Sequence, residues 1–249
     1  MSVTEQDLTN ELKPRSFIST LSTFDWIWAV LLIVGTVYAY QQYSTHMDVY
    51  EVGILFGTGI TLIGLGWGWK ATRIFMLIVG VLIMYAISLY SGDINQIEQK
   101  FLLKYLISSQ SATMWMSALF IMATVTYFIQ LFSGNEFVGK VATSMVWSAT
   151  AMGTIGLLVR WRESYLINPD YGHIPVSNLY EVFILFAVIT ALIYLFYEMK
   201  FKTRNLGGFA LLVISASIAF LLWYHFEKGA HEIQPLVPAL QSYWMKIHV

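Results

Sequence analysis

Seven apolar stretches, each close to the length that crosses a lipid bilayer, constrain the fold of this chain more than any other feature. A transmembrane helix needs about 20 apolar residues. The stretches are Phe24–Tyr40, Val52–Trp69, Ile74–Tyr90, Ser111–Phe132, Val138–Trp161, Leu179–Tyr197 and Gly207–Tyr224. No alternating strand pattern competes with them, and all five prolines lie outside them. The sequence predicts an all-α, polytopic membrane helix bundle of about seven transmembrane helices.

Composition supports a membrane protein and excludes several functions. Only 12% of residues are charged, whereas soluble domains carry about 25%. The chain has no cysteine, so it cannot carry out thiol–disulfide exchange or hold an iron–sulfur cluster. It has no P-loop, no dinucleotide fingerprint and no paired mid-span carboxylates, which excludes ATPases, Rossmann enzymes and most proton-coupled pumps. The net charge of −1 gives no reason to expect a nucleic-acid partner.

Three regions follow from this pattern. Residues 1–22 are polar and mixed in charge, so we expect a cytosolic N-terminal tail rather than a signal peptide. Residues 23–224 form the bundle, and an amphipathic segment near 93–107 is expected to lie as a helix along the membrane surface. Residues 225–249 form an extracytoplasmic segment in which Pro238 could begin a helix that is cut short at Val249.

Positive charges indicate the orientation. Lys200, Lys202 and Arg204 crowd the short connection between the sixth and seventh stretches, which places that connection in the cytosol. Alternation then places the N-terminus inside and all five histidines outside. These are His46, His173, His225, His231 and His248. Imidazole is the commonest metal ligand, so this gathering suggests chemistry at the outer face.

The densest polar cluster is the run Gly172–Glu181, which reads GHIPVSNLYE. Asn178 can cap the sixth apolar stretch, and Glu181 lies three residues later, as in a capping box. The cap does not explain His173. That histidine is either a surface residue or a group that faces a bound ligand, and composition alone favours the surface position.

Other candidate motifs have structural explanations. His225 and His231 are six residues apart, which is a weak metal signal, and a solvated loop is the favoured interpretation. The tryptophan-rich run Gly66–Lys70 lies at the end of an apolar stretch, where interfacial anchoring accounts for it. Small residues suited to close helix packing lie on the fifth stretch: Ala149, Gly153 and Gly156.

The last residues carry a more specific signal. Leu240, Trp244 and His248 share one helical face at four-residue spacing. An imidazole beside a large aromatic side chain is a reasonable wall for a porphyrin. One histidine alone does not make a haem site.

Several stretches resemble one family, the cytochrome c assembly proteins of the CcsA/ResC type, and in particular the proteobacterial subgroup often labelled CcsB. The similar stretches are Gly172–Glu181, His231–Gln241, Trp244–Val249 and, for the subgroup, Phe101–Gln110. The resemblance extends over nearly the whole chain after residue 50.

The resemblance implies a haem-handling protein of the bacterial inner membrane. Such a protein delivers haem b at the outer face for covalent attachment to the cysteines of apocytochrome c, together with a ResB-type partner. His248 matches the first of two histidines that flank a tryptophan-rich motif, WGxxWxWD, and so becomes the candidate axial ligand of the haem iron. Trp244 is a candidate wall of the site, and His173 is a weaker candidate.

The same resemblance is incomplete. The tryptophan-rich motif, the second flanking histidine and a later membrane histidine are absent from this sequence. The chain therefore resembles the N-terminal portion of such a protein, and we expect the missing C-terminal portion to complete the site. No self-contained active site is expected.

Two alternatives remain from the sequence. The chain could be a non-catalytic scaffold or docking subunit of a haem or respiratory assembly complex. A small-solute transporter has less support, because no stretch is broken at mid-membrane and no mid-span charge marks a pathway.

Overall fold

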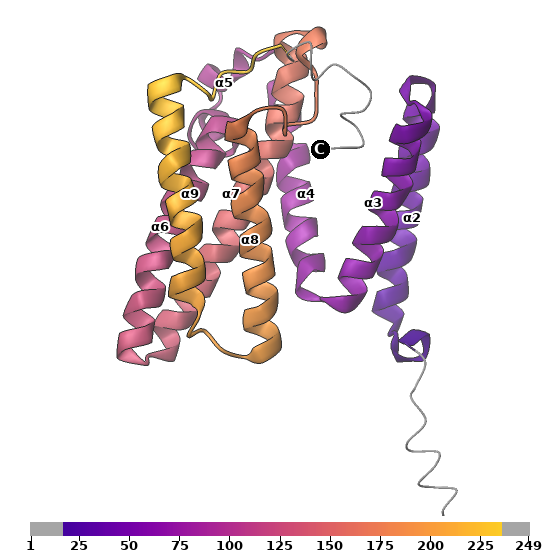
Figure 1. Cartoon of the computed structure of the whole chain (residues 1–249). Helices are drawn as coiled ribbons and strands as arrows, with labels where there is room; N and C mark the ends of the chain where they lie inside the picture. The colour runs from indigo at the N-terminus through magenta and orange to yellow at the C-terminus, as the bar shows by residue number, and fades with distance from the viewer. Residues whose placement is uncertain (1–16, 236–249) are drawn as a thin grey trace, which may run out of the picture. The chain divides into compact units, whose positions relative to one another are not determined.

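The computed structural model describes residues 17–235, which contain seven long helices and no strand (Figure 1). The helices are α2 (Thr23–Tyr43), α3 (Val49–Gly68), α4 (Ala71–Tyr90), α6 (Ser109–Ser133), α7 (Glu136–Ile167), α8 (Leu179–Phe201) and α9 (Gly207–Lys228). All seven are long and apolar enough to cross a membrane. The predicted all-α membrane bundle is confirmed, and each helix begins within three residues of its predicted start.

The chain divides into two compact units, residues 1–74 and 75–249, with the boundary inside α4. In the first unit, α2 and α3 both begin with a capping box. The Asp48 carboxylate accepts the backbone N–H of Glu51 at 2.9 Å, and Glu51 accepts the N–H of Asp48 at 3.0 Å. At α2 the Asp25 carboxylate accepts both the backbone N–H and the hydroxyl of Ser22. Local sequence therefore sets the start of both helices.

Tryptophan and arginine side chains join α2 to α3. The indole of Trp28 donates to the Leu62 carbonyl at 3.2 Å, and that of Trp67 donates to the Asp25 carbonyl at 2.9 Å. Arg73 forms an ion pair with the buried Asp25 carboxylate. Interfacial anchoring is therefore an incomplete explanation of the tryptophan-rich run, because Trp67 also holds two helices together.

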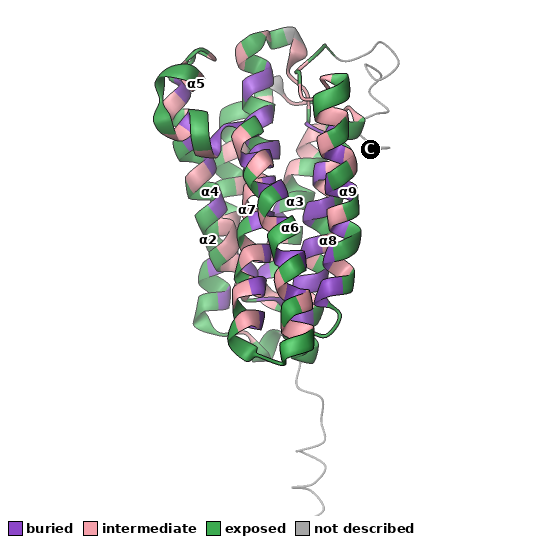
Figure 2. Ribbon diagram, turned by 90° about the vertical axis from the view of Figure 1, so that its left-hand side faces the viewer, coloured by how far each residue is buried: buried purple, intermediate pink, exposed green. Residues whose placement is uncertain are grey.

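The second unit packs α6, α7, α8 and α9 as neighbouring pairs, and buried residues gather on the faces that these helices turn toward one another (Figure 2). Because the helices are apolar on all sides, hydropathy alone does not select the packed face. A further buried cluster links α4 to α7 and includes Ala86, Tyr90, Leu103, Ile107 and Ile155.

Small residues on α7 allow close helix approach, as the sequence predicts. A Cβ atom on Gly153 would lie 2.6 Å from Met116 Sδ on α6 and 2.7 Å from Val188 Cγ2 on α8. On Gly156 it would lie 3.0 Å from the Thr113 hydroxyl. Ala149 is fully buried. A larger side chain at Gly153 would therefore push against side chains of both α6 and α8.

We expect Gly153→Val to destabilise the protein by about 1–3 kcal/mol, because overpacking forces neighbouring side chains and backbone apart. Thermal unfolding of the detergent-purified protein measures this change. The matched control is Gly80→Val on α4, where no atom lies within 4 Å of the added Cβ. Equal melting temperatures for the two variants would contradict the close packing.

The connection between α4 and α6 differs from the single amphipathic helix that the sequence predicts. It contains a short helix, α5 (Gln96–Gln99), an extended residue at Lys100 and a π-helical turn over Leu103–Ile107. The inward-facing side chains are Ile94, Ile97, Leu103 and Ile107. Phe101 and Tyr105, which a continuous helix would place on the same face as Ile94 and Ile97, are exposed. The break and the wide turn shift the helical phase, which moves them to the outside.

One exposed ion pair ties this connection together. Lys104 Nζ donates to the Glu98 carboxylate at 2.6 Å. This hydrogen bond raises the pKa of Lys104. Both side chains are largely solvent-exposed, so the pair orders the surface and contributes little to stability.

Candidate functional site

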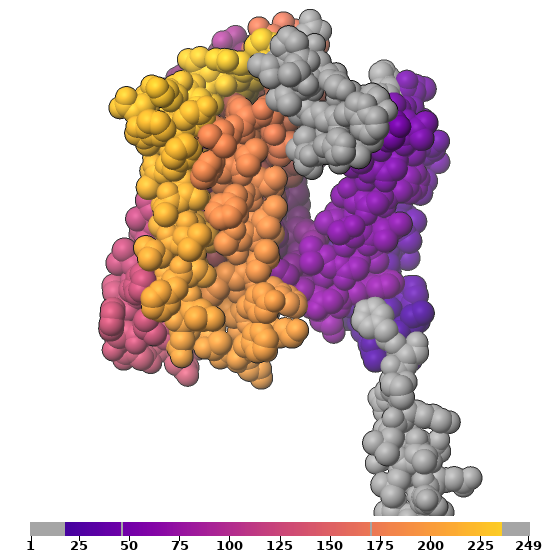
Figure 3. All heavy atoms as spheres, in the orientation of Figure 1, coloured from indigo at the N-terminus to yellow at the C-terminus, as the bar shows by residue number. Residues whose placement is uncertain are grey.

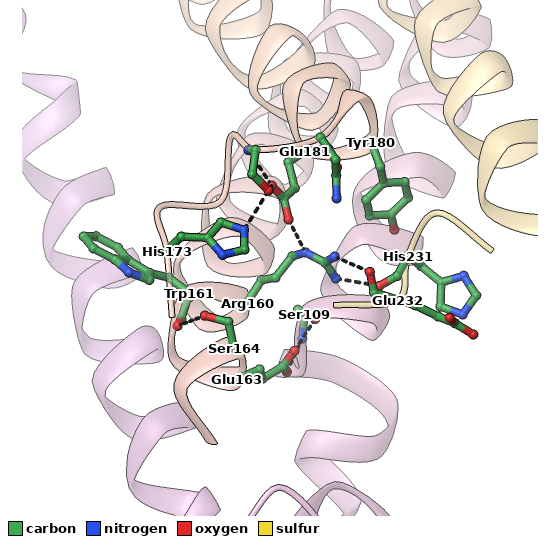
Figure 4. Close-up of polar contacts among 12 residues, drawn as sticks. Ser109, Arg160, Trp161, Glu163, Ser164, His173, Tyr180, Glu181, His231 and Glu232 are labelled. Atoms are coloured by element: carbon green, nitrogen blue, oxygen red, sulfur yellow. Dashed lines mark hydrogen bonds and ion pairs between the residues drawn. The ribbon is translucent and has the colours of Figure 1, made fainter. Parts of the chain in front are cut away.

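A buried arginine joins three segments at one end of the second unit (Figure 4). Arg160, near the end of α7, is 3% exposed. Its Nε donates to Glu181 Oε1 on α8 at 2.7 Å. Its two terminal nitrogens donate to the carbonyls of His231 at 2.6 Å and Glu232 at 3.2 Å, both beyond α9. The guanidinium thus fixes the position of the chain that leaves α9.

The start of α8 is partly as the sequence predicts. The Asn178 side chain accepts the backbone N–H of Glu181 at 2.9 Å, which confirms the predicted cap. The Glu181 carboxylate does not complete a capping box. It accepts the backbone N–H of Ser177 at 2.8 Å and the Ser177 hydroxyl at 3.0 Å, and it pairs with Arg160. The buried cation on the neighbouring helix determines where this carboxylate lies.

His173 is held by hydrogen bonds on both sides of its ring. Its Nδ1 lies 2.6 Å from the Tyr171 carbonyl, and its Nε2 lies 2.7 Å from the Ser177 hydroxyl. The ring therefore braces the connection between α7 and α8. A ring nitrogen of His173 would have to exchange a partner before it could bind an iron or another metal ion.

His225 and His231 form a stacked pair, so the solvated-loop interpretation is wrong. Their ring centroids are 4.0 Å apart with an interplanar angle of 22°. His225 Nδ1 lies 3.4 Å from the Tyr180 hydroxyl, and His231 Nδ1 lies 3.4 Å from the His225 carbonyl. Parallel rings direct their lone pairs side by side rather than at one point. Within residues 17–235 no group of three or more acidic or histidine side chains could hold a metal ion.

A second buried carboxylate lies close to Arg160. Glu163 on α7 accepts hydrogen bonds from the Tyr90 hydroxyl on α4 and from both the backbone N–H and the hydroxyl of Ser109 at the start of α6. Glu163 is 4% exposed. Its partners are 73 and 54 residues away in the chain, so no local pattern in the sequence reveals this cluster.

The opposite end of the second unit has its own carboxylate cluster, which the sequence analysis also missed. Glu198 on α8 accepts from the hydroxyls of Tyr127 and Tyr194 at 2.6 Å, from Thr143 at 2.5 Å and from Arg204 at 3.1 Å. The only local signal is the four-residue spacing of Tyr194 and Glu198. The cluster ties α6, α7 and α8 to the connection that precedes α9.

A polar pocket of about 210 Å³ lies between the start of α8 and the end of α9. Gly229 ends α9 in the left-handed conformation with φ of 59°, and the chain then turns to form one wall. The pocket is lined by His173, Ser177, Asn178, Glu181, Tyr224, Lys228, Gly229, Ala230, Glu232, Ile233, Gln234 and Pro235. The two runs that the sequence singled out, Gly172–Glu181 and the start of His231–Gln241, therefore meet here.

The two strongest candidates from the sequence, His248 and Trp244, lie outside the described residues, as does the side chain of His46. Of the predicted site residues, only His173 falls in the described part. The structure brings it to the same pocket as the segment that precedes those candidates.

Comparison with known proteins gives one consistent result. The chain is 33% identical over 129 residues to the cytochrome c biogenesis protein CcsA of Chlorella vulgaris, which covers 51% of this chain and 38% of the relative. It is 32% identical over 144 residues to CcsA of Marchantia polymorpha, covering 52% and 41%. It is 30% identical over 132 residues to CcsA of Prochlorococcus marinus (strain MIT 9303), covering 53% and 38%.

No family model and no solved structure matches the chain. The matched part spans about two fifths of the length of each of these curated relatives. Over about half of its own length, the chain is a homologue of the cytochrome c biogenesis proteins named CcsA.

Proposed function

We propose that this chain acts in cytochrome c biogenesis and handles haem at the outer face of a bacterial inner membrane for covalent attachment to apocytochrome c. The observation that carries the proposal is the similarity to the CcsA proteins over half the chain. Seven helices able to cross a membrane fit a component that works at its surface. The proposal includes further polypeptide that acts together with this chain.

In this proposal His248 would hold the iron of haem b, and Trp244 would form part of the wall of the site. A polypeptide with the tryptophan-rich motif would complete the site, and a ResB-type protein would be the membrane partner. Bound haem supplies vinyl groups, to which the cysteine thiols of the apocytochrome add. The role of this chain is positioning, since the reacting thiols belong to the substrate.

The described residues fit the polar end of a haem better than its iron. Both ring nitrogens of His173 are occupied, and His225 and His231 stack on each other. The pocket between α8 and α9 offers polar side chains beside an aromatic surface. This division agrees with an iron ligand that lies farther along the chain, at His248.

The alternative is a membrane scaffold that contributes helices and binds no haem. The close packing around Gly153 would serve either function. Named relatives in cytochrome c biogenesis favour the haem-handling role. The two functions differ in whether the purified complex carries haem absorbance.

We expect His248→Ala to lower the haem content of the purified complex several-fold and to lower cytochrome c maturation to a similar extent. The measurement is the haem Soret absorbance per protein, together with haem staining of the cytochrome c produced in the same cells. His46→Ala, a histidine to which no role is assigned, serves as the control and should keep both values. Full haem content in His248→Ala, or no haem in the parent complex, would refute the proposed function.

A further inference from the structure

Three hydrogen-bond donors that line the pocket between α8 and α9 have no partner among residues 17–235. The Asn178 amide uses its oxygen to cap α8, and its nitrogen donates to no described residue. The Tyr224 hydroxyl and the Lys228 ammonium likewise have neither a hydrogen bond nor an ion pair there. The acidic Glu181 in the same wall is already neutralised by Arg160 at 2.7 Å. Donors without partners, next to an acid whose charge is already balanced by Arg160, suit a ligand with anionic oxygen atoms.

The size of the pocket restricts what can enter it. Pockets that enclose a whole drug-sized ligand measure about 300–1,000 Å³. This pocket measures about 210 Å³. It can therefore hold a carboxylate-bearing side arm, but the body of a large ligand must lie outside.

An aromatic surface begins at the mouth of the pocket. Tyr224, which lines the pocket, stacks on Phe220 with ring centroids 5.8 Å apart and on Trp223 at 6.3 Å. The ring centroids of Phe220 and Phe183, which lies on α8, are 4.7 Å apart. Trp223 is 50% exposed. These four side chains lie on α8 and α9, which run side by side across the face seen in Figure 3.

A polar pocket beside a partly exposed aromatic surface matches an amphipathic, planar ligand with carboxylate arms. A flat macrocycle gains from aromatic contact, and its carboxylate gains from charge-assisted hydrogen bonds. We propose that this pocket binds a propionate group of haem through Lys228 and Tyr224, while the porphyrin lies over the aromatic surface of Phe183, Phe220, Trp223 and Tyr224. The proposal rests on the proposed function, because it assigns a further part of the haem site.

Two residues of opposite charge in the pocket lead to opposite predictions for ligand binding. Lys228 and Glu232 both line the pocket, and they do not pair with each other in the structure. A carboxylate ligand is attracted by the first and repelled by the second. Removal of the lysine charge should weaken binding, whereas removal of the glutamate charge should strengthen it.

The test compares haem with haem dimethyl ester, in which both propionates are esterified and uncharged. Each is titrated into the full chain in detergent, and the dissociation constant is obtained from the absorbance change. For Lys228→Gln we expect binding of haem to weaken about tenfold, the size of one charge-assisted hydrogen bond, and binding of the ester to stay unchanged. Tyr224→Phe, which keeps the ring, should act in the same direction. Lys228→Arg should retain haem affinity, and Glu232→Gln should increase it.

The two ligands separate recognition from structural damage. A misfolded variant binds neither haem nor the ester, whereas loss of a propionate contact weakens the binding of haem alone. If Lys228→Gln binds both ligands more weakly while Lys228→Arg binds both normally, the propionate assignment is overturned. Unchanged haem affinity in both Lys228→Gln and Tyr224→Phe would overturn it as well. If the parent chain binds neither ligand, the proposed haem-handling function fails, and this inference fails with it. If the parent binds both with equal affinity, the function stands and only the inference is lost.

Discussion

Arg160→Gln will destabilise the protein by about 3–5 kcal/mol. The substitution leaves the Glu181 carboxylate buried without its cation, and breaking one side of a buried ion pair has this cost. It also removes the donors to the carbonyls of His231 and Glu232. Thermal or denaturant unfolding of the purified protein in detergent measures the loss.

A double variant separates the ion pair from the other bonds. In Arg160→Gln/Glu181→Gln no buried charge lacks a partner, so we expect it to be more stable than Arg160→Gln alone. The remaining loss then reports the contacts to the segment beyond α9. If Arg160→Gln changes stability by less than about 1 kcal/mol, the arginine is hydrated rather than buried and does not fix that segment.

The helices were the predictable part of this structure because membrane crossing imposes a length and a composition on each of them. All seven starts lie within three residues of the prediction, and α8 and α9 begin where predicted, at Leu179 and Gly207. The ends were less predictable. Helix α7 continues to Ile167, six residues beyond the predicted Trp161, because the polar residues after the apolar stretch pack against other segments of the protein.

The polar clusters could not be predicted, because their partners come from distant parts of the chain. Neither Arg160 nor Glu163 lies in a recognisable motif of the sequence. Their partners depend on which helices are neighbours, and apolar periodicity does not encode this in helices that are apolar on all sides. The Asn178 cap was predictable since all its atoms lie within four residues.

The histidines illustrate the same limit. Sequence reasoning gathered all five on one side of the membrane and favoured a solvated position for His225 and His231. In the structure these two rings stack against each other, and the His231 carbonyl accepts a hydrogen bond from Arg160. Six residues of separation give no hint of stacking, because the turn at Gly229 reverses the chain between them. The run Gly172–Glu181, in contrast, was recognisable as a polar cluster because several polar residues lie in a short segment.

Glu163→Ala will cost about 3 kcal/mol or more. It leaves three buried donors without an acceptor, namely the Tyr90 hydroxyl and both the N–H and the hydroxyl of Ser109. Each buried donor left unsatisfied costs about 1–3 kcal/mol. The cluster joins α4, α6 and α7, so we expect unfolding to lose cooperativity as well as shift to lower temperature. Calorimetry of the purified protein measures both.

Two further variants separate the loss of the acceptor from the loss of charge. Glu163→Gln keeps one acceptor oxygen and should cost less than half as much, whereas Tyr90→Phe removes one donor and should cost about 1 kcal/mol. Glu136, an exposed acid at the first turn of the same helix, is the matched control, and its replacement by alanine should cost at most about 1 kcal/mol. Equal effects of Glu163→Ala and Glu136→Ala would mean that water reaches the Glu163 carboxylate and that α4 is not held to α7 at this point. A large loss confined to Glu163→Ala would instead show that this buried carboxylate holds α4, α6 and α7 together by accepting hydrogen bonds from the neutral donors of Tyr90 and Ser109.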